Sequence, residues 1–132
     1  MNDRGVAGTR IRAWAVRLAR SFRFAARGIW IARSGANFRI QLVSAGVVVF
    51  LTVAYGITGS HLGLVVVCVT AVLAAELANT AVERICDLIA QLHGIGLDPR
   101  IRDIKDLAAG SVLVVALGAL VNGIIVFGPR LT

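Results

Sequence analysis

Three stretches of this chain are almost free of charge, and they constrain its fold more than any other feature. The first covers 40–57 with no charged residue, the second begins near His61 and is uncharged to Ala75, and the third covers 107–127. In a helix, about 20 apolar residues cross the hydrocarbon core of a bilayer. Strands of this composition would need turn residues at short intervals, and these stretches contain few. We therefore predict an all-α membrane protein with three membrane-spanning helices, over about 40–57, 61–92 and 106–127.

The overall composition agrees with this prediction but leaves one rival. Of the 132 residues, 58% are hydrophobic and 16% are charged, against about half and a quarter in average globular chains. So short a chain cannot bury that much apolar surface inside itself. The net charge of +7, however, also fits a nucleic-acid-binding protein. The placement of the basic residues decides between the two classes.

Most basic residues flank the apolar stretches. Nine of the fourteen precede position 40, a second set lies between 84 and 105, and the 56–60 connection has none. The positive-inside rule then predicts a multi-pass protein whose N-terminus and 84–106 loop face the cytoplasm. Arg130 near the C-terminus runs against this orientation.

Residues 1–39 form a basic arm before the first predicted span. Apolar residues recur every three or four positions, and arginines occupy the other side. The apolar set is Ile11, Trp14, Leu18, Phe22, Ala25 and Ile29, and the basic set is Arg10, Arg17, Arg20 and Arg27. This pattern predicts an amphipathic surface helix that lies along anionic lipid headgroups. A nucleic-acid-binding arm explains the arginines but not the ordered apolar face, so we expect no nucleic-acid partner.

Four polar residues in the second apolar stretch and just after it share one helix face. Glu76, Asn79, Glu83 and Asp87 are separated by three, four and four residues, which is the spacing of one helical stripe. Counted from Leu62, Glu76 lies about 21 Å along the helix, in the inner leaflet, and Glu83 lies about 10 Å further. A carboxylate within the hydrocarbon is costly and is therefore a functional candidate. A helix that simply leaves the membrane explains Asp87 but explains Glu76 poorly.

Charged residues at 102–106 open the third apolar stretch. Asp106 could be no more than a partner of the helix dipole. Together with the stripe, however, Lys105 supplies a cation for a phosphate, next to carboxylates that could hold Mg²⁺.

The run ELANTAVERICDLI, residues 76–89, resembles the signature of the prokaryotic diacylglycerol kinase and undecaprenol kinase family, which are small integral-membrane lipid kinases. Two further segments resemble the family: 105–110, where Lys-Asp precedes small residues, and 37–40, Asn-Phe-Arg-Ile. The resemblance covers roughly residues 15–127. It divides the chain into an arm, 1–39, and a three-helix kinase domain, 40–132.

The resemblance implies a bacterial inner-membrane enzyme that transfers the γ-phosphate of ATP to the hydroxyl of a membrane lipid, undecaprenol or diacylglycerol, with Mg²⁺ as cofactor. It implies that Glu76 is the general base and that Glu83 binds the metal. It also implies a homotrimer with sites between subunits. The other assignments that it implies are Asn79, Glu83, Asp87, Gln91, His93, Lys105 and Asp106 at the nucleotide site, and Phe38, Arg39 and Glu76 at the lipid site.

Two features depart from the family pattern. Gly35 stands where the family has a glutamate that shares the metal, and the 88–104 connection is longer than usual. Mg²⁺ is often held by one or two carboxylates plus substrate phosphates, so Gly35 does not exclude activity. The alternative is a weakened or inactive family member that binds lipid or a partner. A third possibility is an ion or proton pathway along the Glu76 stripe.

Overall fold

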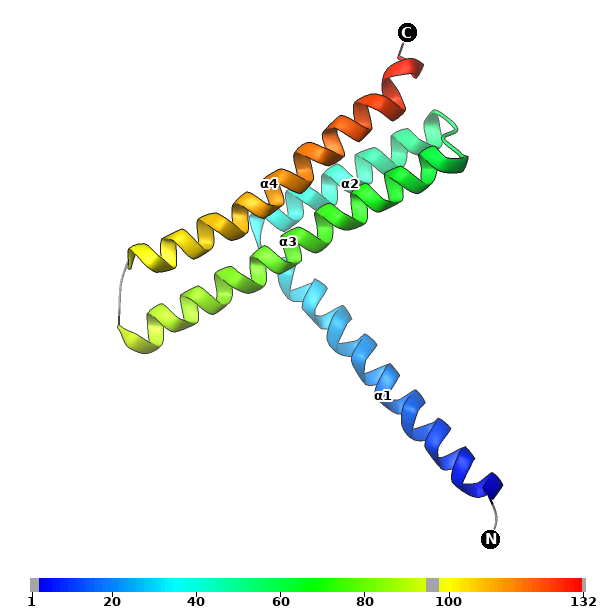
Figure 1. The fold of residues 1–132 in the computed structure, drawn as a ribbon, viewed down its shortest axis with the longest axis vertical. Helices are drawn as coiled ribbons and strands as arrows, with labels where there is room; N and C mark the ends of the chain where they lie inside the picture. Colours follow the sequence, from blue (N-terminus) through cyan, green and yellow to red (C-terminus); the bar gives the residue numbers. More distant parts are fainter. Residues whose placement is uncertain (1–2, 95–97, 132) are drawn as a thin grey trace. The chain divides into compact units, whose positions relative to one another are not determined.

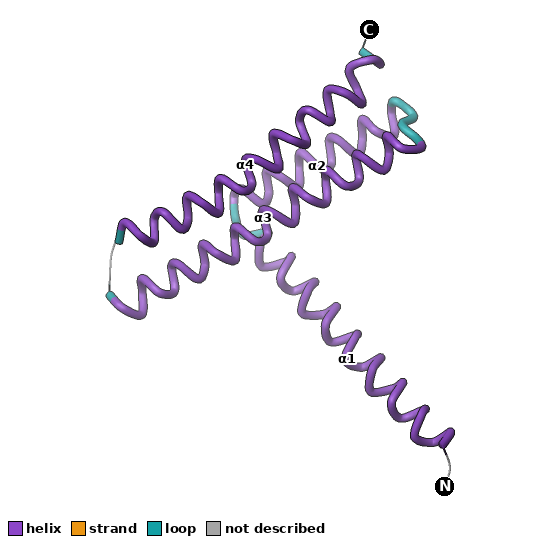
Figure 2. The backbone as a smooth tube through the Cα atoms, viewed as in Figure 1, coloured by secondary structure: helices purple, strands orange, loops and turns teal. Residues whose placement is uncertain are grey.

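The computed structural model describes residues 3–94 and 98–131, and all of its regular elements are helical (Figures 1 and 2). The helices are α1 (Asp3–Ala32), α2 (Ala36–Ala54), α3 (Gly59–His93), α4 (Pro99–Phe127) and the short 3₁₀ helix η1 (Gly128–Arg130). The chain divides into two units, Met1–Ser34 and Gly35–Thr132.

Helices α2, α3 and α4 are each long and apolar enough to cross a membrane, which confirms the all-α fold with three candidate spans. Their 19, 35 and 29 residues correspond to about 28, 52 and 43 Å. The hydrocarbon core is only about 30 Å thick, so α3 and α4 are too long to end inside it unless strongly tilted. Figure 1 shows these two helices running together beyond the start of α2.

Helix α4 begins seven residues before the span predicted to start at 106, and the long 88–104 connection is mostly helical. Asp98 caps α4 by accepting a hydrogen bond from the Arg100 backbone N–H at 2.9 Å, and Pro99 favours a helix start. Hydrogen bonds from the side chain and backbone of Arg100 hold the pKa of Asp98 below its ordinary value. Gly94 ends α3 in the left-handed region, at φ +60°. Most of this connection therefore belongs to the end of α3 and the start of α4; residues 95–97 lie outside the described part.

Packing within the second unit centres on α3, which lies against α4 over most of its length and against α2 over a shorter one. An apolar cluster forms where α2 turns into α3 and α4 ends. Its buried members are Ile57, Val65 and Val126, with Val48, Val69 and Phe127 partly buried around them. Tyr55 meets Phe127 edge to face, with ring centroids 6.3 Å apart. This cluster closes one end of the three-helix unit.

Most apolar side chains of the spans are exposed in the single chain. Within the most apolar 18-residue windows of the three spans, only 11%, 17% and 11% of residues are buried. Exposed apolar surface of this extent requires lipid or further protein to cover it. Helix α1 is likewise exposed along its apolar side, at Trp14, Phe22 and Ile29; its position on a membrane surface stays a prediction.

Candidate active site

Two polar side chains on α3 are buried within a candidate membrane span. Glu76 and Asn79 are each only 3% exposed. The other buried polar residue in the described part of the chain is Thr52, whose hydroxyl donates to the Val48 carbonyl one turn back at 2.7 Å. Thr52 is therefore satisfied by its own helix. Glu76 and Asn79 carry polar atoms that no such local bond explains.

The Asn79 carboxamide lies between two carboxyl groups. Its Nδ2 donates to Glu83 Oε1 at 3.2 Å, and the same side chain hydrogen-bonds the carboxyl of Glu76. The predicted stripe is therefore a hydrogen-bonded group of three side chains. The remaining amide atom, Asn79 Oδ1, is buried and has no hydrogen-bond partner among the described residues.

An ion pair continues this group towards the ends of α3 and α4. Lys105 Nζ donates to Asp87 Oδ1 at 3.0 Å, and the side chains are 38% and 58% exposed, respectively. The charge of Glu83 also acts on Lys105. An ion pair this exposed contributes at most about 1 kcal/mol to stability, so it does not bind Lys105 firmly in place. The ammonium group is available to another anion.

The other residues that the sequence assigned to the site lie elsewhere. Gln91 and His93 are exposed near the C-terminus of α3, about 22 and 26 Å along the helix from Glu76, and His93 Nδ1 meets the Ile89 carbonyl at 3.0 Å. Asp106 is exposed on α4. In the first turn of α2, Phe38 is buried and Arg39 is exposed. The single chain thus joins the stripe to Lys105 and leaves Gln91 and His93 apart from Glu76.

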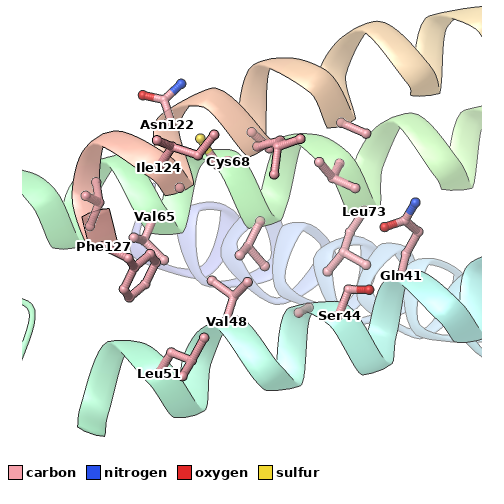
Figure 3. A pocket seen from close by; sticks show the side chains of 18 of the residues that line it. Gln41, Ser44, Val48, Leu51, Val65, Cys68, Leu73, Asn122, Ile124 and Phe127 are labelled. Carbon is pink, nitrogen blue, oxygen red and sulfur yellow. The ribbon is translucent and has the colours of Figure 1, made fainter. Parts of the chain in front are cut away.

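A groove of about 580 Å³ lies between α2, α3 and α4, and the sequence did not reveal it (Figure 3). Its walls are largely apolar, with Gln41, Ser44 and Asn122 among the polar lining residues. Figure 3 shows Gln41 and Leu73 towards one end and Phe127 towards the other. Leu73 is one helical turn before Glu76, so the groove approaches the buried carboxyl from within the membrane.

The same residues allow a test of whether Mg²⁺ would fit. Among the side chains described, no three of His, Cys, Asp and Glu are grouped as metal ligands, and Gly35 offers no side-chain donor at the N-cap of α2. Mg²⁺ takes oxygen ligands and often uses one or two carboxylates together with substrate phosphates. Glu83, with the unpartnered oxygen of Asn79 on the same stripe, fits that requirement.

Comparison with known proteins gives two matches. Residues 23–127 match the family described as prokaryotic diacylglycerol kinase. Over 116 residues the chain is 32% identical to a Bacillus subtilis (strain 168) protein named undecaprenol kinase, and the match covers 87% of this chain and 91% of that relative. No solved structure matches the chain. The family match contains α2, α3 and α4, and with them the whole stripe and its ion pair.

Proposed function

The chain belongs to the prokaryotic diacylglycerol kinase family, and we propose that it transfers the γ-phosphoryl group of ATP to the hydroxyl of a membrane lipid. One observation carries the proposal: a buried carboxyl in a membrane span, Glu76, is linked through Asn79 to the half-buried Glu83. We propose undecaprenol as the acceptor because of the name of the 32% identical relative, with diacylglycerol as the other candidate.

The lipid alcohol reaches the site from the bilayer. Its hydrocarbon chain lies in the groove between α2, α3 and α4, and its hydroxyl reaches Glu76 past Leu73. Phe38 and Arg39 contact the same lipid from the start of α2. Glu76 accepts the hydroxyl proton while the oxygen bonds to the γ-phosphorus and the bond from that phosphorus to ADP breaks. A base held in place in this way contributes about 10²–10⁴-fold to the rate.

The nucleotide arrives from the aqueous side. Lys105 exchanges its contact with Asp87 for one with a phosphate, and Asp106, Gln91 and His93 are proposed to contact the rest of the nucleotide. Mg²⁺, held by Glu83, would neutralise charge on the phosphates. Phosphoryl transfer depends mainly on positioning and charge neutralisation, so few protein groups are needed.

We also propose the placement of the protein in the cell. The N-terminus and the α3–α4 connection face the cytoplasm of a bacterial inner membrane, where ATP is present. Two further copies of the chain, which complete the proposed homotrimer, cover the exposed apolar faces of the spans. The arginines of α1 contact anionic headgroups.

The test is a panel of lipid acceptors with ATP labelled in the γ-phosphate, Mg²⁺ and the purified protein in nanodiscs. We expect labelled phosphate on undecaprenol, and a loss of about 10²–10⁴-fold in kcat for Glu76→Gln. Asp103→Asn is the matched control, since this exposed acid on α4 lies outside the stripe. Unchanged turnover in Glu76→Gln would rule out Glu76 as the general base. No transfer to any lipid would refute the kinase activity.

A second candidate is a weakened or inactive kinase that binds lipid, and the absence of a side chain at Gly35 favours it. In that case the natural chain shows little transfer and Gly35→Glu raises turnover strongly. If Gly35→Glu leaves normal turnover unchanged, the cation uses other ligands. Proton flux in liposomes without nucleotide would instead indicate a proton pathway along the stripe.

A further inference from the structure

The orientation of the Asn79 carboxamide is fixed by its neighbours. An ionised carboxylate can only accept hydrogen bonds, so a carboxamide beside it must present its nitrogen. Asn79 Nδ2 faces Glu83 Oε1 at 3.2 Å, and the side chain also bonds the Glu76 carboxyl. The amide oxygen is consequently left without either carboxyl group as a partner. Oδ1 is unsatisfied because the amide nitrogen must face the carboxyl oxygens, and not because the amide orientation was chosen arbitrarily.

That unsatisfied oxygen is deeply enclosed. The Asn79 residue is 3% exposed, and its Oδ1 has no hydrogen-bond partner within the described parts of the chain. Burying an amide acceptor without a partner costs the free energy of its hydration. Native proteins leave few such atoms, and a bound water or ion accounts for many of those that remain. Asn79 Oδ1 therefore requires a partner other than the protein atoms that the structure describes.

The surroundings favour a cation as that partner. Glu76 and Glu83 both lie on the same stripe and present carboxyl oxygens close to the amide. The nearby Asp87 is already paired with Lys105, and Asp98 is paired with Arg100. Hard divalent cations take carboxylate and Asn carbonyl oxygens as ligands.

We propose that Asn79 Oδ1 is a ligand of a divalent cation bound at Glu83. The inference rests on the proposed function in one respect, namely that this cation is the one accompanying ATP. The amide keeps this orientation: Nδ2 donates to Glu83 Oε1, and the cation lies between Asn79 Oδ1 and the other carboxyl oxygen of Glu83. Asn79 then binds the metal directly as well as orienting the two carboxyl groups.

The test measures cation binding and does not depend on turnover. The full chain in nanodiscs is titrated with Mn²⁺, alone and with a non-hydrolysable ATP analogue, and the free Mn²⁺ signal is followed by electron paramagnetic resonance. We expect Asn79→Ala to weaken Mn²⁺ binding at least about tenfold, a loss typical of a missing ligand or its support. Thr70→Ala on α3 is the matched control, because that hydroxyl donates to the Val66 carbonyl of its own helix.

Asn79→Asp keeps the result interpretable if the alanine variant is poorly folded. It replaces the amide oxygen with a carboxylate oxygen, so we expect it to tighten Mn²⁺ binding, and misfolding cannot produce tighter binding. Unchanged Mn²⁺ affinity in both variants would overturn the proposal and leave water as the partner of Oδ1. Failure of the proposed function looks different: the natural chain binds Mn²⁺, the Asn79 variants shift the affinity, and no lipid is phosphorylated.

Discussion

Lys105, the proposed phosphate-binding residue, forms only a weak surface ion pair in this structure. Its ammonium group is held by Asp87 at 3.0 Å, across the interface between α3 and α4. Both side chains are substantially exposed, so water and salt screen the pair and its contribution to stability is small. A triphosphate carries several charges and competes well for such a cation. The ion pair with Asp87 keeps Lys105 beside the carboxylate stripe and still allows its ammonium group to bind another anion.

Lys105→Met should therefore harm nucleotide use far more than stability. We expect the KM for ATP to rise at least about tenfold, because a charge-assisted contact to phosphate contributes about 1.5–3 kcal/mol. The free energy of unfolding should change by less than about 1 kcal/mol. Lys105→Arg keeps the charge and should retain most of the affinity. The measurements are ATP kinetics in nanodiscs and thermal unfolding.

Arg102→Met provides the control, since Arg102 is an exposed cation earlier on α4 that is not placed in the site. An unchanged KM in Lys105→Met, or an equal effect from Arg102→Met, would contradict the assignment of Lys105 to phosphate.

The individual site residues differ in how far the sequence could predict their geometry. The helical spacing of Glu76, Asn79 and Glu83 already placed them on one face, and the structure finds hydrogen bonds along that face. The Asp87–Lys105 pair joins residues 18 apart, so it required the antiparallel packing of α3 on α4. The unpartnered oxygen of Asn79 was not predictable, because spacing says nothing about which atoms remain unsatisfied.

At the scale of helices, the uncharged stretches predicted the three spans, but not where α4 begins. Hydropathy identifies the apolar part of a helix that can lie in lipid, and it does not detect a polar extension of the same helix. The start of α4 is set by a cap at Asp98 and by Pro99, which are local backbone effects. Likewise, the groove depends on how three helices are arranged, and the periodicity of a single helix does not predict that arrangement.

Helix α1 leads to a prediction about one element. No acidic residue lies between Asp3 and Glu76, so nothing in the intervening chain neutralises the arginines. Each arginine near an anionic surface contributes about 1 kcal/mol, so replacing Arg12, Arg17 and Arg20 by Gln should weaken docking about 100-fold. Docking is measured by tryptophan fluorescence in a Trp30→Phe background, in which Trp14 is the sole tryptophan. Brominated lipids should quench the Trp14 fluorescence when phosphatidylglycerol is present.

Replacing the same three arginines by lysine is the matched control and should preserve the quenching, since the attraction depends on charge. High salt should abolish the quenching both in the protein with the natural arginines and in the lysine variant. Quenching that is equally strong in zwitterionic nanodiscs would show that the apolar side alone docks α1 and would contradict a role for the arginines.

At the scale of the whole molecule, the exposed apolar faces need further partners, whereas the polar group around Glu76 forms within a single chain. Spans with so few buried residues need lipid or other copies around them. The stripe and Lys105, by contrast, come together within one chain through contacts at 3.2 and 3.0 Å. In an oligomer, neighbouring copies could therefore complete the walls around lipid and nucleotide, while the proposed base and the proposed phosphate-binding cation come from the same subunit.

This division predicts the outcome of mixing two inactive variants. Glu76→Gln removes the proposed base and Lys105→Met removes the proposed phosphate-binding cation, and both losses fall on the site of one chain. Mixed oligomers of the two should therefore stay as inactive as either variant alone, because no site regains both groups. The measurement is lipid phosphorylation after co-expression, with two different affinity tags used in sequence to isolate the mixed oligomers. Recovered activity would place Glu76 and Lys105 of one active site on different subunits, and the contact between Lys105 and Asp87 within the chain would then be incidental to catalysis.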